Sequence, residues 1–367
     1  MHRRALVVGR LLVGGTFGGA ELDGVRDQLV ALGLAAILAG RGLATGTRAG
    51  RLGLCPGRVP CRVDWVCWSA RFSAARHEHD YAKEPRHDFD VSVSTAMPLW
   101  FAAVLGLIQG LTEFIPVSST AHLRVAPALF GQPDPGAPFT AVIQLGTLIA
   151  VLAYFAKDLA GLPSAMFRDG ASFEGRLPWL LAVGTLPIVI CGLAFKKHIE
   201  GDLRSLYVVA TALIVVGIVM ALIDHFVGGR TDHRPLGSIT FTDALLVGCA
   251  QSMALVPGVS RSGATMCMIL LLGFSRSDSA RFSFLLSIPA IAGAGIFEAK
   301  DAFQQLGPSA MPAIAIATTV AAISGYASIA WLLKWLGSHS LIGFAIYRIA
   351  CGAALLSALA SGFLRRV

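Results

Sequence analysis

Charged residues are scarce in this sequence of 367 residues. Asp, Glu, Lys and Arg together make up 14% of it, whereas hydrophobic residues make up 55%. A soluble domain carries roughly 25% charged residues, and a soluble core could not cover this much apolar surface. The composition therefore argues against an ordinary soluble globular protein and indicates that the lipid bilayer is the solvent.

Several functional signatures are also missing. The sequence contains neither a P-loop nor a Rossmann glycine fingerprint. It has no basic face interleaved with aromatic residues, so the net charge of +8 does not indicate nucleic-acid binding. The seven cysteines form neither a disulfide framework nor a tetrahedral zinc spacing. We therefore predict no nucleic-acid partner and no structural metal.

Residues 1–96 differ from the rest of the chain. They are rich in Arg and Gly, and their apolar stretch, residues 28–40, is too short to span a bilayer and is not a convincing signal peptide. We interpret them as a poorly ordered tail, or as sequence translated from a start site assigned too early, without a catalytic role. Met97 begins the predicted membrane domain, 97–367.

The membrane domain contains long apolar runs separated by polar loops with Arg and Lys. Each run is near the ~20 residues that a helix needs to cross ~30 Å of hydrocarbon. The runs occupy residues 137–156, 178–195, 204–226, 279–299, 309–335 and 338–364. This pattern predicts an all-α, polytopic membrane protein. Because Lys and Arg occur on both sides however the chain is threaded, the positive-inside rule does not settle its orientation.

Two further apolar regions, 98–130 and 241–273, are interrupted by Pro, Gly and a cluster of Ser, Thr and Arg. Such a break at membrane depth is tolerated only where the backbone faces protein or water. The two regions resemble each other. Gly106 precedes Gln109 by three positions, as Gly248 precedes Gln251.

Each broken region is followed by three full-length runs. A re-entrant hairpin does not change the side of the membrane, whereas three spans do, so the second copy must be inverted. We predict an inverted repeat of one re-entrant helical hairpin plus three transmembrane helices, with repeat one at about 98–226 and repeat two at about 241–364. Such repeats place a polar site between broken helices near the midplane. Two facing helix N-termini would bind an anion of phosphate size.

The first broken region carries the groups for proton transfer or nucleophilic attack. Gln109 and Glu113 are four apart and share a helix face. A charge at bilayer depth costs at least ~2.5–3.5 kcal/mol, so Glu113 is a functional candidate. Ser118 or Ser119 could simply cap the next helix, and His122 could simply be a packing residue. The presence of a carboxylate, a hydroxyl and an imidazole close together in the sequence favours a catalytic role for these residues.

The second broken region carries the groups for binding an anion. Gly258 lets the backbone turn sharply, and the planar guanidinium of Arg261 matches phosphate oxygens. Ser260, Ser262 and Thr265 add hydroxyl donors. Arg261 could instead be an interfacial residue that extends to water. Together the two regions predict phosphoryl transfer, which needs mainly positioning and charge stabilisation.

These two regions resemble the motifs of the undecaprenyl-diphosphate phosphatases of the BacA type. Residues 109–122, QGLTEFIPVSSTAH, are similar to the first motif, and residues 257–265, PGVSRSGAT, to the second. The likeness covers 97–367 and has two departures. Gln109 stands where many members have Glu, so it cannot be a base or a strong metal ligand. Ala121 replaces the usual Gly. Residues 1–96 have no counterpart in the family.

The resemblance implies hydrolysis of undecaprenyl diphosphate to undecaprenyl phosphate and inorganic phosphate, which recycles the lipid carrier for peptidoglycan synthesis. It also implies a bacterial inner membrane, a site accessible from the periplasmic side, and bacitracin resistance on overexpression. It further implies a divalent cation, Mg²⁺ or Ca²⁺, with Glu113 as its ligand. The resemblance is also compatible with a homodimer.

By position, the resemblance assigns two sets of residues. The catalytic set is Glu113, Ser119, His122 and Arg261. The substrate-binding set is Gln109, Ser118, Thr120, Gly258, Ser260, Ser262 and Thr265.

As a mechanism we expect Ser119 to be the nucleophile, with Glu113 or His122 as its base. His122 as the direct nucleophile is the competing version. Arg261 neutralises the phosphate, and the prenyl tail leaves between helices into the lipid. The alternative function is a polyprenyl-phosphate or ion-coupled membrane transporter, because inverted repeats with broken helices also describe transporters. A non-catalytic scaffold would leave both polar clusters unexplained.

Overall fold

The computed structural model describes residues 97–200, 202–228 and 230–366. Within this part of the chain all regular structure is helical, apart from one isolated bridge between Arg234 and Phe274. The predicted all-α fold is therefore confirmed. The prediction for residues 1–96 lies outside the described residues.

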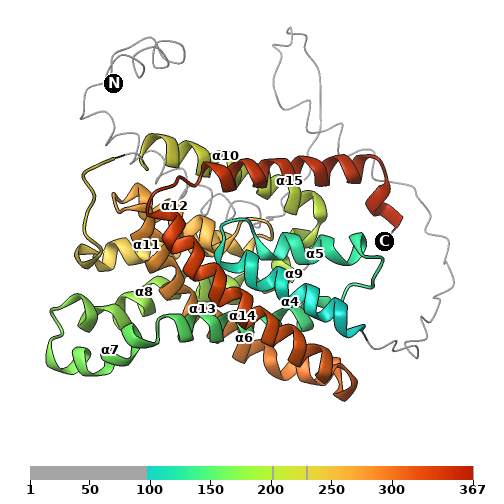
Figure 1. The fold of residues 1–367 in the computed structure, drawn as a ribbon, viewed down its shortest axis with the longest axis horizontal. Helices are drawn as coiled ribbons and strands as arrows, with labels where there is room; N and C mark the ends of the chain where they lie inside the picture. The colour runs from blue at the N-terminus through green and yellow to red at the C-terminus, as the bar shows by residue number, and fades with distance from the viewer. Residues whose placement is uncertain (1–96, 201, 229, 367) are drawn as a thin grey trace, which may run out of the picture. The chain divides into compact units, whose positions relative to one another are not determined.

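Each of the six predicted apolar runs coincides with a long helix (Figure 1). These helices are α6 (Gly136–Tyr154), α8 (Phe173–Ala194), α10 (Leu206–Phe226), α13 (Arg276–Leu306), α14 (Met311–Leu336) and α15 (Ile342–Ala360). All except α13 are apolar and long enough to cross a membrane. At 31 residues and 1.5 Å per residue, α13 is about 46 Å long, also enough to span. The chain is a multi-pass membrane protein.

Large apolar side chains stay exposed on the outward faces of these helices. Ile190 of α8 is 63% exposed, Ile323 of α14 68% and Ile346 of α15 61%. Large exposed apolar side chains on several helices are unusual for a soluble monomer. In a bilayer they face hydrocarbon, and the helices satisfy their own backbone groups as a lipid environment requires.

Both predicted helix breaks are confirmed. The first lies between α4 (Leu99–Phe114) and α5 (Ser119–Leu129). The second follows α11 (Phe241–Ser252) and the short 3₁₀ turn η4 (Met253–Leu255), and ends where α12 (Arg261–Leu271) begins. Proline explains the stops, because it removes a backbone donor and disfavours helix at the residue before it. Pro116 and Pro257 occupy the two breaks.

The two halves of the domain pack in a matching way. α4 packs on α14, and α11 packs on α8, while α6 pairs with α13 and α10 with α15. The last pair lies side by side across the top of Figure 1.

The glycines that begin each motif allow this packing. A Cβ on Gly106 would lie 2.3 Å from the Ala317 carbonyl oxygen, and one on Gly248 would lie 2.3 Å from the Gly184 carbonyl oxygen. Small residues permit such close helix contact in membranes. This packing supports a repeat. The re-entrant path of the two hairpins and the inverted orientation of the two copies remain predictions.

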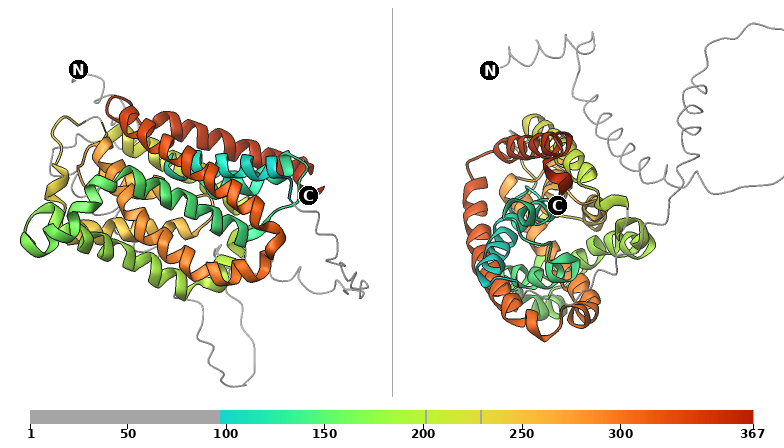
Figure 2. Two further views of the ribbon diagram at one scale, coloured as in Figure 1. Left: turned by 60° about the horizontal axis from the view of Figure 1, so that its bottom comes forward. Right: turned by 90° about the vertical axis from the view of Figure 1, so that its right-hand side faces the viewer.

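The long helices run in roughly one direction in the left view of Figure 2, with the broken helices among them. A buried aromatic contact fixes the end of α4. The Phe114 ring meets Phe284 of α13 edge to face, with ring centroids 5.2 Å apart. Because Glu113 directly precedes Phe114, this contact also fixes the position of the carboxylate.

The sequence did not predict α7 (Ala156–Arg168), an amphipathic helix between α6 and α8. Asp158 in its first turn and Arg168 in its last turn suit the helix dipole. The remaining short elements are α9 (Lys196–Glu200), η2 (Asp202–Arg204), η3 (Leu236–Ser238), η5 (Pro308–Ala310) and η6 (Phe363–Arg366).

Candidate active site

The two helix breaks bring the two motifs together. At each break, the residue before the new helix is a serine with positive φ, 75° at Ser118 and 73° at Ser260. Residues other than glycine rarely adopt this conformation. The turn places Ser119 and Arg261 at the first positions of α5 and α12.

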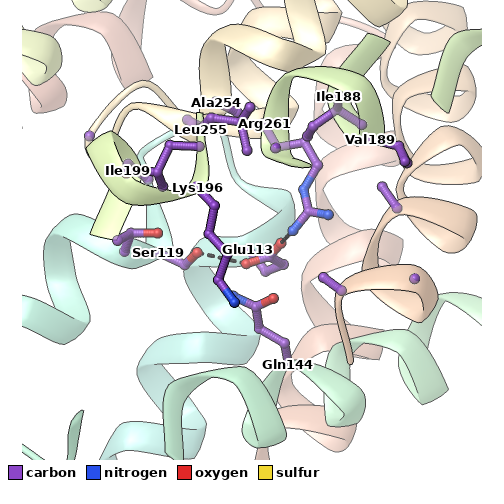
Figure 3. Close-up of a pocket in the computed structure, with 18 of the residues that line it drawn as sticks. Glu113, Ser119, Gln144, Ile188, Val189, Lys196, Ile199, Ala254, Leu255 and Arg261 are labelled. Carbon is purple, nitrogen blue, oxygen red and sulfur yellow. Dashed lines mark hydrogen bonds and ion pairs between the residues drawn. The ribbon is translucent and has the colours of Figure 1, made fainter. Parts of the chain in front are cut away.

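Glu113 is the centre of the site. Its Oε2 atom accepts hydrogen bonds from Ser119 Oγ at 2.6 Å and from Gln109 Nε2 at 3.0 Å. Its Oε1 atom accepts from Arg261 Nη2 at 2.8 Å and forms an ion pair with it. Figure 3 shows the side chains of Glu113, Ser119 and Arg261 converging from α4, α5 and α12. The Glu113 side chain is buried, so each of these interactions is only weakly screened by water.

The other hydroxyls of the second motif hold the backbone. Ser262 Oγ donates to the Glu113 carbonyl at 3.2 Å. Ser260 Oγ accepts from the Gly263 amide at 3.2 Å and so caps α12. Thr265 Oγ1 donates to the Arg261 carbonyl at 2.8 Å. These contacts orient the first turn of α12 and link it to the end of α4.

A cavity of about 480 Å³ opens beside Glu113 and Arg261, within the size range of small-molecule sites. Seven of the residues assigned by the resemblance line it: Glu113, Ser118, Ser119, Thr120, Gly258, Ser260 and Arg261. Four others do not line it: Gln109, His122, Ser262 and Thr265.

The rest of the cavity wall is mainly apolar. It comes from α8, α9, η4 and α13, through Ile188, Val189, Gly192, Leu193, Ile199, Ala254, Leu255, Ala290, Gly293 and Ala294. A cavity with one polar end and one apolar wall suits an amphiphilic ligand whose charged head and hydrocarbon tail separate.

His122 lies outside this cavity. Its Nδ1 atom is 2.8 Å from the Ser118 carbonyl oxygen, and its Nε2 atom is 2.8 Å from the Tyr347 hydroxyl. A carbonyl only accepts, so Nδ1 carries a proton and donates it. The ring stacks on Tyr347 with an interplanar angle of 3°. Both ring nitrogens are therefore engaged, and neither contacts Ser119.

Sequence reasoning missed Arg348, which is fully buried in α15. Its Nη1 atom donates to the Pro116 carbonyl at 3.2 Å, and its Nη2 atom donates to the carbonyls of Gly258 at 2.8 Å and Val259 at 3.0 Å. One guanidinium thus holds both helix breaks. A permanent charge within an apolar run was the available signal, since the same argument identified Glu113.

Two more polar residues line the cavity and were not predicted: Gln144 of α6 and Lys196, where α8 passes into α9. Gln144 lies in a predicted span, where a polar residue is a weak signal. Lys196 falls in a Lys-Lys-His sequence that was interpreted only as a loop.

Comparison with known proteins identifies the family of the chain. Residues 102–354 match the family model of the bacitracin resistance protein BacA. An undecaprenyl-diphosphatase of Myxococcus xanthus is 50% identical over 274 residues, covering 72% of this chain and 91% of that protein. An undecaprenyl-diphosphatase of Chlorobium phaeobacteroides is 48% identical over 281 residues, covering 73% and 100%. A third relative, from a Nocardioides species, is 48% identical over 267 residues, covering 71% and 96%. The chain belongs to the family of the bacitracin resistance protein BacA.

Proposed function

We propose that this protein hydrolyses undecaprenyl diphosphate to undecaprenyl phosphate and inorganic phosphate, and so recycles the lipid carrier for peptidoglycan synthesis. The family and the names of the relatives support this activity. The observation that carries it is the cluster of Glu113, Ser119 and Arg261 at the polar end of a largely apolar cavity.

Ser119 is the proposed nucleophile and Glu113 its base. The 2.6 Å hydrogen bond from Ser119 Oγ to Glu113 Oε2 is the geometry for proton transfer. Ser119 Oγ bonds to the terminal phosphorus while its proton passes to Glu113. The bond from that phosphorus to the bridging oxygen breaks, and undecaprenyl phosphate leaves. Water then hydrolyses the phosphoserine, which releases inorganic phosphate and restores the hydroxyl.

Arg261 stabilises the charge that develops on the phosphate. One of its nitrogens is held by Glu113, and the guanidinium has further N–H groups for phosphate oxygens. The first amides of α5 and α12 also lack intrahelical acceptors and carry positive dipole character. We expect Arg261→Ala to lose ~2.7–4 kcal/mol of transition-state stabilisation, as removal of a comparable donor does.

A divalent cation, Mg²⁺ or Ca²⁺, is part of the proposal. Both metals take oxygen ligands, and Mg²⁺ is commonly held by one or two carboxylates plus substrate phosphates. Glu113 offers a carboxylate that lines the cavity, so it fits such a cation. The buried Gln109 Oε1 atom has no hydrogen-bond partner among the described residues, but an amide oxygen would be only a weak second ligand. Within the described part of the chain, no three His, Cys, Asp or Glu side chains gather as metal ligands. The substrate would therefore supply the other oxygens.

When bound, the cation would neutralise phosphate charge. Chelation with EDTA is expected to lower turnover, and added Mg²⁺ or Ca²⁺ to restore it. Full activity in EDTA would exclude the metal.

We place the protein in the bacterial inner membrane with the site accessible from the periplasmic side, as the family resemblance implies. Labelling single cysteines at the cavity mouth with a membrane-impermeant reagent tests the side. Labelling of intact spheroplasts agrees with the proposal, and labelling only of inverted vesicles contradicts it.

The deciding experiment for function measures phosphate release from undecaprenyl diphosphate by the purified protein in detergent. A transporter needs sealed vesicles and releases no phosphate. Release by the wild type and its loss in Arg261→Ala support the phosphatase. No release from a folded wild type would reject it.

A further inference from the structure

The apolar wall of the cavity is built mainly by α8 and α13, which pack on each other. They touch closely at one level, where a Cβ on Gly184 of α8 would lie 2.9 Å from the Leu286 Cδ1 atom of α13. Leu286 is fully buried. A hydrocarbon chain therefore cannot pass between the two helices at this level.

About two turns farther along both helices, the space beside them is open. Val189 and Leu193 of α8 and Gly293 and Ala294 of α13 line the cavity there. Among the described residues, no heavy atom lies within 4 Å of a Cβ placed on Gly293. Leu193 is 63% exposed, and Gly293 and Ala294 are exposed as well. Residues of both helices that line the cavity are therefore also accessible from outside.

Each helix contains a proline between the closed level and the open one. Pro187 of α8 comes three residues after Gly184, and Pro289 of α13 comes three residues after Leu286. A proline within a helix removes a backbone hydrogen bond, and its ring clashes with the carbonyl four residues earlier, so it bends the helix. Both helices thus have a place to bend apart just beyond their contact.

The cavity is too small to enclose a long lipid. Its volume of about 480 Å³ is that of a site for a drug-sized ligand. Most of an undecaprenyl chain must therefore stay in the bilayer while the diphosphate reaches Arg261. Ile188 and Val189 of α8 appear together with Arg261 in the upper part of Figure 3, and all three line the cavity. The apolar wall therefore leads to the charged groups.

We infer that the cavity opens to the lipid between α8 and α13, and that the prenyl chain of the substrate passes through this opening into the bilayer. This inference rests on the proposed function. Aliphatic side chains and small residues line the opening, and contact of a hydrocarbon chain with such groups is favourable. Gly293 keeps the opening wide, because a side chain at this position would project into it.

The first test is steady-state hydrolysis of undecaprenyl diphosphate in detergent by Gly293→Ala, Gly293→Leu and Gly293→Trp. These variants should fold, because glycine is a poor helix former and the added atoms meet open space. Their kcat/KM should fall stepwise with side-chain size, by about tenfold or more in Gly293→Trp, since displacing two methylene groups of the chain has an effect of this order. Isopentenyl diphosphate, which has a single isoprene unit, is used as a competitive inhibitor, and its inhibition constant should stay within about twofold.

Gly343→Trp is the matched control for these variants. Gly343 of α15 is exposed, and among the described residues no heavy atom lies within 4 Å of a Cβ placed on it, but it does not line the cavity. This variant should behave as the wild type. A wild-type kcat/KM in Gly293→Trp, or an equal loss of affinity for isopentenyl diphosphate, would overturn the inference.

The second test locates the chain without turnover. A prenyl methylenediphosphonate with a photoreactive group on its chain should label residues 187–194 of α8 or 289–294 of α13, as found by peptide mapping. A wild type that is labelled there but releases no phosphate would reject the proposed hydrolysis and keep the opening. An active wild type that is labelled only on other helices would reject the opening and keep the hydrolysis. This measurement also decides if a Gly293 variant fails to fold.

Discussion

Ser118 and Ser260 share one unusual backbone conformation, with φ angles of 75° and 73°. Each directly precedes a residue that the mechanism uses, Ser119 in one half and Arg261 in the other. Backbone strain of this kind persists where the surrounding structure holds it, commonly at functional sites. The two turns are therefore alike in backbone although they present different chemistry.

The strain predicts a difference between two glycine variants. Ser118 makes no side-chain cap hydrogen bond, so Ser118→Gly should relieve strain and raise the free energy of unfolding by up to about 1 kcal/mol. Ser260→Gly loses the cap to Gly263, which should offset that gain. Thermal unfolding in detergent measures both. A less stable Ser118→Gly protein would show that the turn is not strained.

Glu113→Gln should remove the base while keeping the size of the side chain. We expect kcat to fall about 10²–10⁴-fold with a smaller change in KM. Asp158→Asn is the matched control, because Asp158 forms an exposed ion pair with Arg281 at 2.9 Å, away from the cavity. It should keep full activity. Comparable losses in both variants would mean that charge removal acts through folding rather than at the site.

Arg348→Met should disconnect the two helix breaks. It leaves three buried carbonyls without their donor, at a cost of about 3 kcal/mol or more. We expect a lower unfolding temperature and loss of phosphate release.

Arg176→Met is the control for this variant. Arg176 also donates to three carbonyls, those of Ser172, Gly237 and Ile239, but it is partly exposed, so water can replace it. It should lose less stability and remain active. An active Arg348→Met enzyme would show that Arg348 is not needed to hold the two helix breaks together.

His122 is expected to position the first break rather than to carry the phosphate. His122→Ala removes the donor to the Ser118 carbonyl, so kcat should fall while KM changes less. Tyr347→Phe loses only the contact at Nε2 and should be milder. Quenching during turnover and mapping the modified peptide tests the nucleophile. We expect acid-stable phosphoserine at Ser119, and phosphohistidine at His122 would contradict this.

Hydrophobic run length and two motifs predicted most of this fold. The long helices and both breaks were predictable because a helix in lipid needs about 20 apolar residues, and Pro116 and Pro257 interrupt that pattern. The meeting of Glu113 and Arg261 was predicted because repeats of this kind place a polar site between their two broken helices.

Side-chain direction was not predictable in the same manner. His122 is close to Ser119 in sequence, but its ring turns away to Tyr347, a residue 225 positions along the chain. Lys196 joins the cavity because α8 ends where it does, which hydropathy does not reveal. Arg348 donates to backbone carbonyls rather than to an acidic side chain. A search of the sequence for an oppositely charged partner could therefore not have identified its role.

The place of Arg348 in the chain has a consequence for biogenesis. Both motifs, 109–122 and 257–265, leave the ribosome well before residue 348. A nascent chain that stops ahead of α15 holds every proposed reacting group but lacks the guanidinium that ties Pro116 to Gly258 and Val259. We therefore expect the site to take its final form only after α15 has been inserted, so that a chain truncated before α15 releases no phosphate.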